Sequence, residues 1–155
     1  MPITITQDKG FGVYEKLAEE NIAIIFKAEP ICIPEDKCDL AQNIYDGYTI
    51  QEAITYKVKT EIAQYYNEKI TTLFPELPYY TQRQSELAPY KQSWWTALFP
   101  NSYTLTPEEE QELSDINDVF VSVCALRAKV AWHKEHMLLN CITFADVAAY
   151  NYKEE

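Results

Sequence analysis

Residues 103–113, YTLTPEEEQEL, hold the clearest helix start in the chain. Thr106 suits an N-cap, Pro107 takes the first helical position, and Glu109 follows three residues after the cap. Downstream, apolar residues recur at alternating spacings of three and four, as in a coiled-coil seam. The seam comprises Ile116, Val119, Val123, Leu126, Val130, His133 and Met137. This pattern predicts one long helix near the C-terminus, ending at Asn140.

Further capping signals lie on both sides of this helix. Thr143 with Asp146 predicts a short final helix. Thr49 with Glu52 predicts another helix start, and the apolar residues that follow extend this helix to Phe74. Residues 61–75 and 86–100 share a near-repeat whose matches fall mainly on an apolar helical face. We interpret it as one packing solution used twice, with 76–85 as a connection.

The first forty-five residues have a different pattern. The stretches ITIT and NIAIIFKA are rich in β-branched residues, VYEKLAEE is helical in pattern, and EPICIPEDKC suits an extended connector. The predicted fold is therefore mainly α within a single domain, residues 1–155. A β-containing arm or small lobe (1–45) precedes a bundle of three to four helices (46–155) that includes the long C-terminal helix.

Composition excludes several classes of function. With 24 acidic and 13 basic residues, the formal charge of −11 repels phosphate backbones and anionic lipids, so no direct nucleic-acid binding is expected. No export signal or membrane-spanning stretch is predicted. The four cysteines form no CxxC pair and are expected to be reduced thiols. We expect a soluble, cytoplasmic protein.

No catalytic residue, metal ligand or cofactor site is assigned. The three glycines form no phosphate-binding loop, and no nucleophile elbow occurs. His133 and His136 are spaced one helical turn apart, with Cys141 beyond them, which leaves a small metal protein or enzyme as an alternative. Because His133 lies on the apolar seam, a packing role is favoured.

An unusual aromatic load falls on predicted loops and helix ends. Tyrosine and tryptophan are enriched in protein interfaces because they bury a large area with little loss of rotamer freedom. The predicted partner-binding residues are Tyr79, Tyr80, Tyr90, Trp94, Trp95 and Tyr103. The alternative is that these side chains cover the core. As a set they favour a protein partner or self-association.

The C-terminal stretch ALRAKVAWHKEHMLLNCITFADVAAY, residues 125–150, resembles the ends of some bacteriophage tail or tail-fibre assembly proteins. The residues that carry the resemblance are Ala125, Leu126, Arg127, Lys129, Cys141, Thr143 and Val147. It covers about a quarter of the chain and implies an assembly or chaperone role without transferring any functional residue.

The sequence thus predicts a non-enzymatic interaction or assembly protein of a phage-related kind. A second hypothesis is an acidic decoy that occupies the nucleic-acid site of a partner, motivated by the net charge and the acids from Glu108 to Asp118. The small metal protein or enzyme that uses His133 and His136 is the third.

Overall fold

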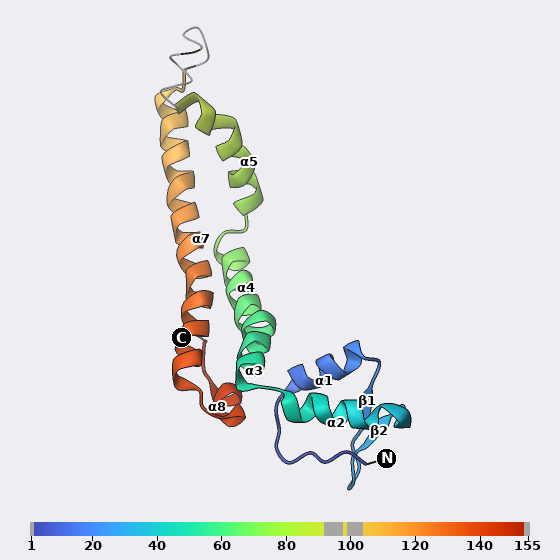
Figure 1. The fold of residues 1–155 in the computed structure, drawn as a ribbon. Coiled ribbons are helices and arrows are strands. Elements are labelled where there is room, and N and C mark those ends of the chain that lie inside the picture. Colours follow the sequence, from blue (N-terminus) through green and yellow to red (C-terminus); the bar gives the residue numbers. More distant parts are fainter. Residues whose placement is uncertain (1, 92–97, 99–103, 154–155) are drawn as a thin grey trace. The chain divides into compact units, whose positions relative to one another are not determined.

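The structure is a computed structural model that describes residues 2–91, 98 and 104–153. The fold is mainly α, with a long C-terminal helix and a small N-terminal sheet, as the sequence predicts (Figure 1). The chain forms two compact units. Unit 1 combines Met1–Gln64 with Val130–Glu155, and unit 2 is Tyr65–Lys129. Each is described by itself.

The N-terminal part of unit 1 contains α1 (Phe11–Glu19), β1 (Ala23–Ile25), β2 (Ile31–Ile33) and α2 (Cys38–Gly47). The two strands pair antiparallel, with Ile24 opposite Cys32. The stretch expected to be a connector therefore holds β2, because its two prolines flank the strand and leave its amides available for pairing. The predicted strand ITIT forms no strand, and the residue before it, Pro2, makes only an isolated bridge to β2.

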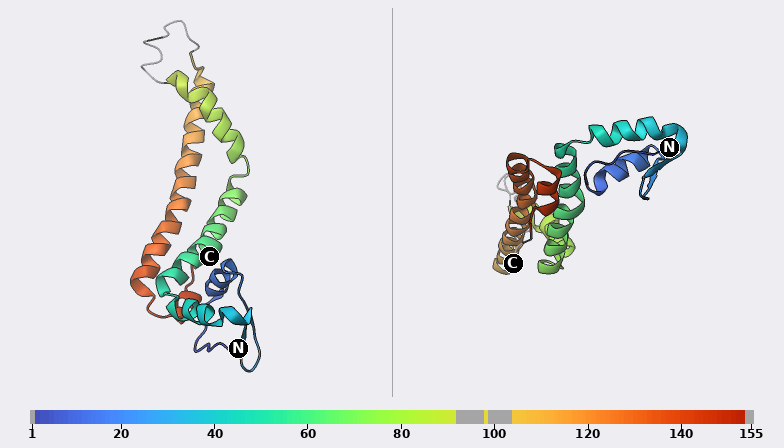
Figure 2. Two further views of the ribbon diagram at one scale, coloured as in Figure 1. Left: turned by 45° about the vertical axis from the view of Figure 1, so that its right-hand side comes forward. Right: turned by 90° about the horizontal axis from the view of Figure 1, so that it is seen from below.

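The rest of unit 1 is built around α3 (Ile50–Lys57) and α8 (Phe144–Ala149), which contact each other. The two views of Figure 2 agree in showing these helices next to one another. Both start as predicted. The Thr49 hydroxyl accepts from the amide of Glu52 at 3.1 Å. Thr143 and Asp146 form a reciprocal capping box.

The helix predicted from Thr49 to Phe74 is continuous but not uniform. After α3, a π-helical turn (Val58–Ile62) leads directly into α4 (Ala63–Leu73). In a π turn each amide bonds the carbonyl five residues back, so one residue is inserted into the helical spacing. Ile62 and Tyr66 are both fully buried on either side of the place where the π turn joins α4.

Unit 2 contains the main part of α4, then α5 (Leu77–Leu87), a 3-10 turn (Ala88–Lys91) and the first part of α7 (Pro107–Asn140). The prediction of a connection at 76–85 was wrong, since α5 occupies it. Gln84 on α5 donates to Asn117 on α7 at 2.9 Å, and Figures 1 and 2 show these two helices side by side. A small apolar cluster holds this unit together: Leu87, Leu105 and Leu113, with Tyr90 packed against it.

The long helix α7 follows the sequence prediction closely. Thr106 and Glu109 bond each other's backbone amides at 3.1 Å, which completes the predicted capping box. The helix ends at Asn140. Every residue of the predicted seam is buried or half-buried. Within the described part of the chain, no helix is both long enough and apolar enough to span a membrane.

Candidate functional site

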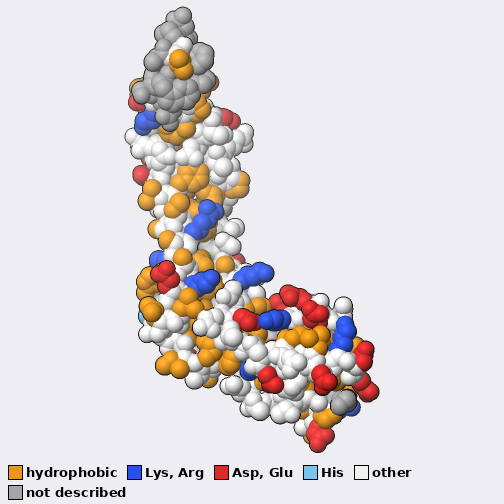
Figure 3. Space-filling view, viewed as in Figure 1, with side chains coloured by type: hydrophobic (Ala, Val, Ile, Leu, Met, Phe, Trp, Pro, Cys, Tyr) orange, Lys and Arg blue, Asp and Glu red, His pale blue; other side chains and the backbone are white. Residues whose placement is uncertain are grey.

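A pocket of about 970 Å³ opens in unit 1 between the N-terminal segment, α3 with its π turn, and α8. Aromatic and aliphatic side chains give most of its area, and polar residues, among them Gln7, Asp8, Thr60, Glu61 and Thr143, complete the lining. The principal aromatic and aliphatic ones are Phe11, Tyr48, Ala53, Tyr56, Phe144 and Val147. Figure 3 shows hydrophobic side chains gathered on the surface of the region that holds α3, α8 and the end of α7. The volume lies at the upper end of the range for ligand-binding pockets.

Lys57 lies beneath the α8 wall of this pocket and is only 6% exposed. Its Nζ donates to the carbonyl oxygens of Val147 at 2.7 Å, Ala148 at 3.0 Å and Tyr150 at 3.2 Å. These carbonyls belong to the end of α8, where helical carbonyls lack intrahelical partners and the helix dipole favours a cation. All three ammonium hydrogens are thereby used within the chain.

Lys9, which also lines the pocket and is 8% exposed, holds a second helix end. Its Nζ donates to the carbonyl oxygen of Tyr45 at 2.6 Å and, more weakly, of Asp46 at 3.5 Å, both near the end of α2. The same ammonium lies 4.6 Å from the ring centroid of Tyr45 and 5.3 Å from that of Phe144. Carbonyl dipoles and ring faces thus replace the water that this cation loses on burial.

The aromatic wall is closely packed against α1. The rings of Tyr48 and Phe144 stack with centroids 6.2 Å apart. Gly12 of α1 faces this wall. A Cβ at this position would overlap the Tyr48 hydroxyl and lie 2.8 Å from Cγ of Tyr56. Only glycine therefore lets α1 approach the two tyrosines this closely.

Two tyrosines of the pocket lining have raised pKa values. Burial, supported by the nearby Glu52 carboxylate, raises the pKa of Tyr48 to about 12. Burial and then the Glu15 carboxylate, which is also a hydrogen-bond partner, raise the pKa of Tyr56. Both phenols keep their protons near neutral pH, whereas a general acid or base works best with a pKa near the working pH. With both lysines bonded to carbonyls, the pocket offers mainly apolar area.

The described residues of the predicted partner-binding set lie on α5 and on the 3-10 turn that follows it. Tyr79, 55% exposed, and the half-buried Tyr80 meet on α5 with ring centroids 5.9 Å apart, and the Tyr80 hydroxyl donates to Glu76 at 3.2 Å. Tyr90 instead packs against the leucine cluster of unit 2. Trp94, Trp95 and Tyr103 lie outside the described residues. The structure therefore brings together two of the three described tyrosines.

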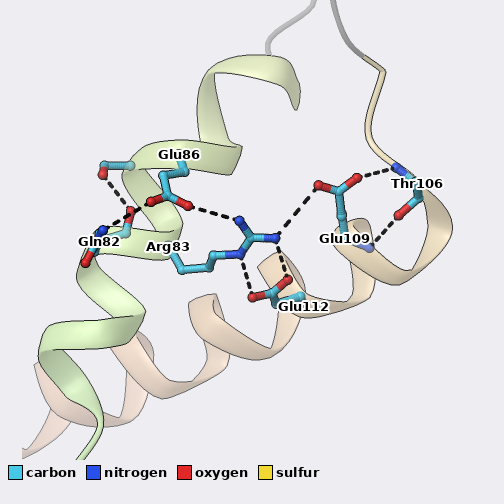
Figure 4. A network of polar contacts seen from close by, with 7 residues as sticks. Gln82, Arg83, Glu86, Thr106, Glu109 and Glu112 are labelled. Carbon is cyan, nitrogen blue, oxygen red and sulfur yellow. Dashed lines mark hydrogen bonds and ion pairs between the residues drawn. The ribbon is translucent and has the colours of Figure 1, made fainter.

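The acidic start of α7 is partly neutralised within unit 2. Arg83 of α5 donates to Glu112 through Nε at 2.8 Å and through Nη2 at 3.2 Å, in a bidentate pair (Figure 4). Its Nη2 also lies 3.8 Å from Glu109, and Nη1 donates to Glu86 at 3.0 Å. Two of the acids on which the decoy hypothesis depends, Glu109 and Glu112, are therefore paired with Arg83 within the chain.

The two histidines have other contacts. His133 is buried, with Nδ1 2.7 Å from the Tyr150 hydroxyl. His136 stacks on Trp132, with centroids 4.9 Å apart and an interplanar angle of 11°. Among the residues that the structure describes, no group of three potential metal ligands was found.

Sequence analysis missed the pocket because its walls come from three distant segments. The one local signal is KGFG at residues 9–12, in which Lys9 and Gly12 both prove structural. Gly10 has a φ of 84°, which glycine adopts without strain. These glycines form no phosphate-binding loop, and Gly12 instead allows a close approach of the backbone to the tyrosines.

Comparisons with protein-family models, with curated proteins and with solved structures each found no match to this chain. The functional interpretation therefore depends on the chain's own geometry and chemistry.

Proposed function

We propose that this chain is a non-enzymatic protein whose work is to bind another protein, and that the unit 1 pocket receives an apolar segment of that partner. One observation carries the proposal. The pocket has mainly apolar walls, while its two buried ammonium groups donate to carbonyls at the ends of α2 and α8. Its free energy of binding would come from burying apolar area.

A protein segment suits this pocket better than a small metabolite. Sites for small molecules place a few polar groups that fix the orientation of the ligand. Here both lysine ammonium groups already donate to carbonyls, the Thr60 hydroxyl donates to the Tyr56 carbonyl, and the Thr143 hydroxyl accepts from the Asp146 amide. The remaining polar side chains of the lining, tyrosines aside, are Gln7, Asp8 and Glu61. Protein interfaces, in contrast, have an apolar centre with aromatic residues.

Further exposed apolar residues of unit 1 enlarge the surface that a partner could cover. Phe11, which lines the pocket, is 80% exposed. Leu139 and Ile142, at the end of α7 and just before α8, are 83% and 77% exposed. Large exposed apolar side chains in a chain of net charge −11 favour a contact surface.

The finer form of the proposal is an assembly role of the phage-related kind, in the cytoplasm. Its support is the resemblance of residues 125–150 to phage tail and tail-fibre assembly proteins. The net charge of −11 is consistent with this role, because it repels nucleic acid and leaves a protein as the expected partner.

A library of random peptides tests the proposal without a known partner. Peptides are selected on the immobilised chain and then tested on two variants that fill the pocket, Ala145→Trp and Ala148→Trp. Both alanines line the pocket and are solvent-exposed, so a tryptophan fits without displacing the core. We expect peptides rich in aromatic and aliphatic residues that lose at least tenfold in affinity on both variants.

The matched control is Ala128→Trp, which adds the same side chain at an exposed position of α7 in unit 2. This variant should bind the selected peptides as the wild type does. Peptides that bind all four proteins equally well, or a selection that yields no binder, would contradict the proposal. Circular dichroism checks that each variant keeps its helix content.

A further inference from the structure

Two cysteines meet inside the N-terminal part of unit 1. Cys32 is the central residue of β2, and Cys38 is the first residue of α2. Both are buried among the core residues of this unit. The sequence separates them by five residues, and a 3-10 turn, Glu35–Lys37, brings the chain back so that α2 begins beside the strand.

The hydrogen bonds place both sulfur atoms against backbone carbonyls of the same short segment, residues 32–34. The Cys38 thiol donates to the carbonyl oxygen of Cys32 at 3.7 Å, and the Cys32 thiol lies 3.4 Å from the carbonyl oxygen of Pro34. The Cys38 sulfur is therefore in direct contact with Cys32, the residue that carries the other thiol. Such mutual contact is the condition for forming a bond without a large movement of the backbone.

We propose that Cys32 and Cys38 are a redox modification site, which forms an intramolecular disulfide by exchange with a disulfide such as oxidised glutathione. One thiolate attacks glutathione disulfide and releases one glutathione, and the second cysteine then displaces the other. The protein dithiol loses two electrons and two protons, and one glutathione disulfide becomes two glutathione molecules. The remaining thiols, Cys124 and Cys141, lie outside this site.

The surroundings of the two cysteines determine how fast the disulfide forms and how much it stabilises the fold. Burial and then the hydrogen bond with Cys38 raise the pKa of Cys32 to about 11, so its thiolate is scarce at neutral pH. Exchange requires local opening and a thiolate, and it should therefore be slow and accelerate as pH rises. The bond would join β2 to α2 and raise the melting temperature by roughly 5 °C, because it restricts the unfolded chain.

The test uses the full chain with Cys124→Ser and Cys141→Ser, so that only the buried pair remains. The folded protein is incubated with oxidised glutathione, its remaining thiols are alkylated in denaturant, and tryptic peptides are analysed without reduction. We expect a product lighter by two hydrogens, in which peptides 28–37 and 38–57 are linked. The reverse variant, Cys32→Ala with Cys38→Ala, keeps the other two cysteines and should yield no internal disulfide.

Two results would overturn the proposal. One is a folded protein that still alkylates at both Cys32 and Cys38 after prolonged oxidation. The other is a stable mixed disulfide with glutathione at either residue, because a neighbouring thiol in bonding distance would displace it. A control variant carries Cys38→Ser in addition. In this variant Cys32 has no second thiol that could displace glutathione, so we expect the mixed disulfide at Cys32 to accumulate.

Discussion

In unit 1, three helices each have a lysine ammonium group bonded to the carbonyl oxygens at their C-terminal end. Besides Lys9 and Lys57, Lys37 donates from Nζ to the carbonyl oxygen of Glu20 at 2.8 Å, at the end of α1. A cation at a helix C-terminus satisfies carbonyls that lack intrahelical partners. Nothing in the sequence around these lysines indicates the role, because each partner lies 17 or more residues away. Local patterns therefore could not reveal it.

We expect Lys57→Met to destabilise the protein by roughly 3 kcal/mol, because the end of α8 loses three charge-assisted hydrogen bonds, one of them buried. The measurement is urea denaturation. The control, Lys59→Met, makes the same change two residues on at an exposed position and should cost less than about 0.5 kcal/mol. Equal losses for the two variants would show that Lys57 does not hold α8.

The glycines provide a second matched pair. Gly12→Ala places a methyl group against Tyr48 and Tyr56 and should cost about 1–3 kcal/mol through overpacking. Gly47→Ala, at the last residue of α2, meets no atom within 4 Å and should be neutral or slightly stabilising. Thermal unfolding compares the two. A neutral Gly12→Ala would mean that α1 does not pack closely against the aromatic wall.

At the scale of elements, helix starts were predictable and strand positions were not. The boxes at Thr106 and Thr143 use residues three apart, so the sequence contains the whole interaction. Strand β2 depends on pairing with β1, and its flanking prolines favoured a connector. α5 was missed because residues 76–85 have little apolar periodicity, and Leu87 is its one buried residue.

The ionisation of Asp146 makes the stability of the start of α8 depend on pH. Hydrogen bonds from the amides of Ile142 and Thr143 lower the pKa of its carboxyl below the ordinary value. A lowered folded pKa means that the stabilisation is present above the unfolded pKa and is lost as pH falls through the folded one. The wild type should be more stable than Asp146→Asn at pH 7. Denaturation at a series of pH values should show this gap closing below about pH 4; a gap that widens in acid would contradict it.

The Arg83–Glu112 pair should couple α5 to α7 within unit 2. A double-mutant cycle with Arg83→Met and Glu112→Gln tests this. Because Arg83 also contacts Glu86 and Glu109, we expect Arg83→Met to lower the denaturation midpoint more than Glu112→Gln does. The coupling should shrink as salt screens the pair. Additive effects of the two substitutions at low salt would indicate that the contact is not energetically significant.

At the scale of the whole molecule, the fold class was predictable but the site was not. The change from β-branched stretches to helical periodicity near residue 46 indicated a mainly α chain with a small β-containing part. The pocket depends on which distant segments meet. Residues 7–12, 48–61 and 143–149 form its lining, and no spacing rule connects them. The aromatic residues expected to bind a partner belong to unit 2 and stay a prediction, separate from the pocket of unit 1.

The most direct test of the central claim is calorimetric titration of one selected peptide into the wild type, Ala148→Trp and Ala128→Trp at several temperatures. The account predicts a negative heat-capacity change for the wild type, since binding buries apolar surface. It also predicts at least tenfold weaker binding to Ala148→Trp and no change for Ala128→Trp. Equal affinity for the wild type and Ala148→Trp would contradict the claim that the unit 1 pocket is the partner-binding site.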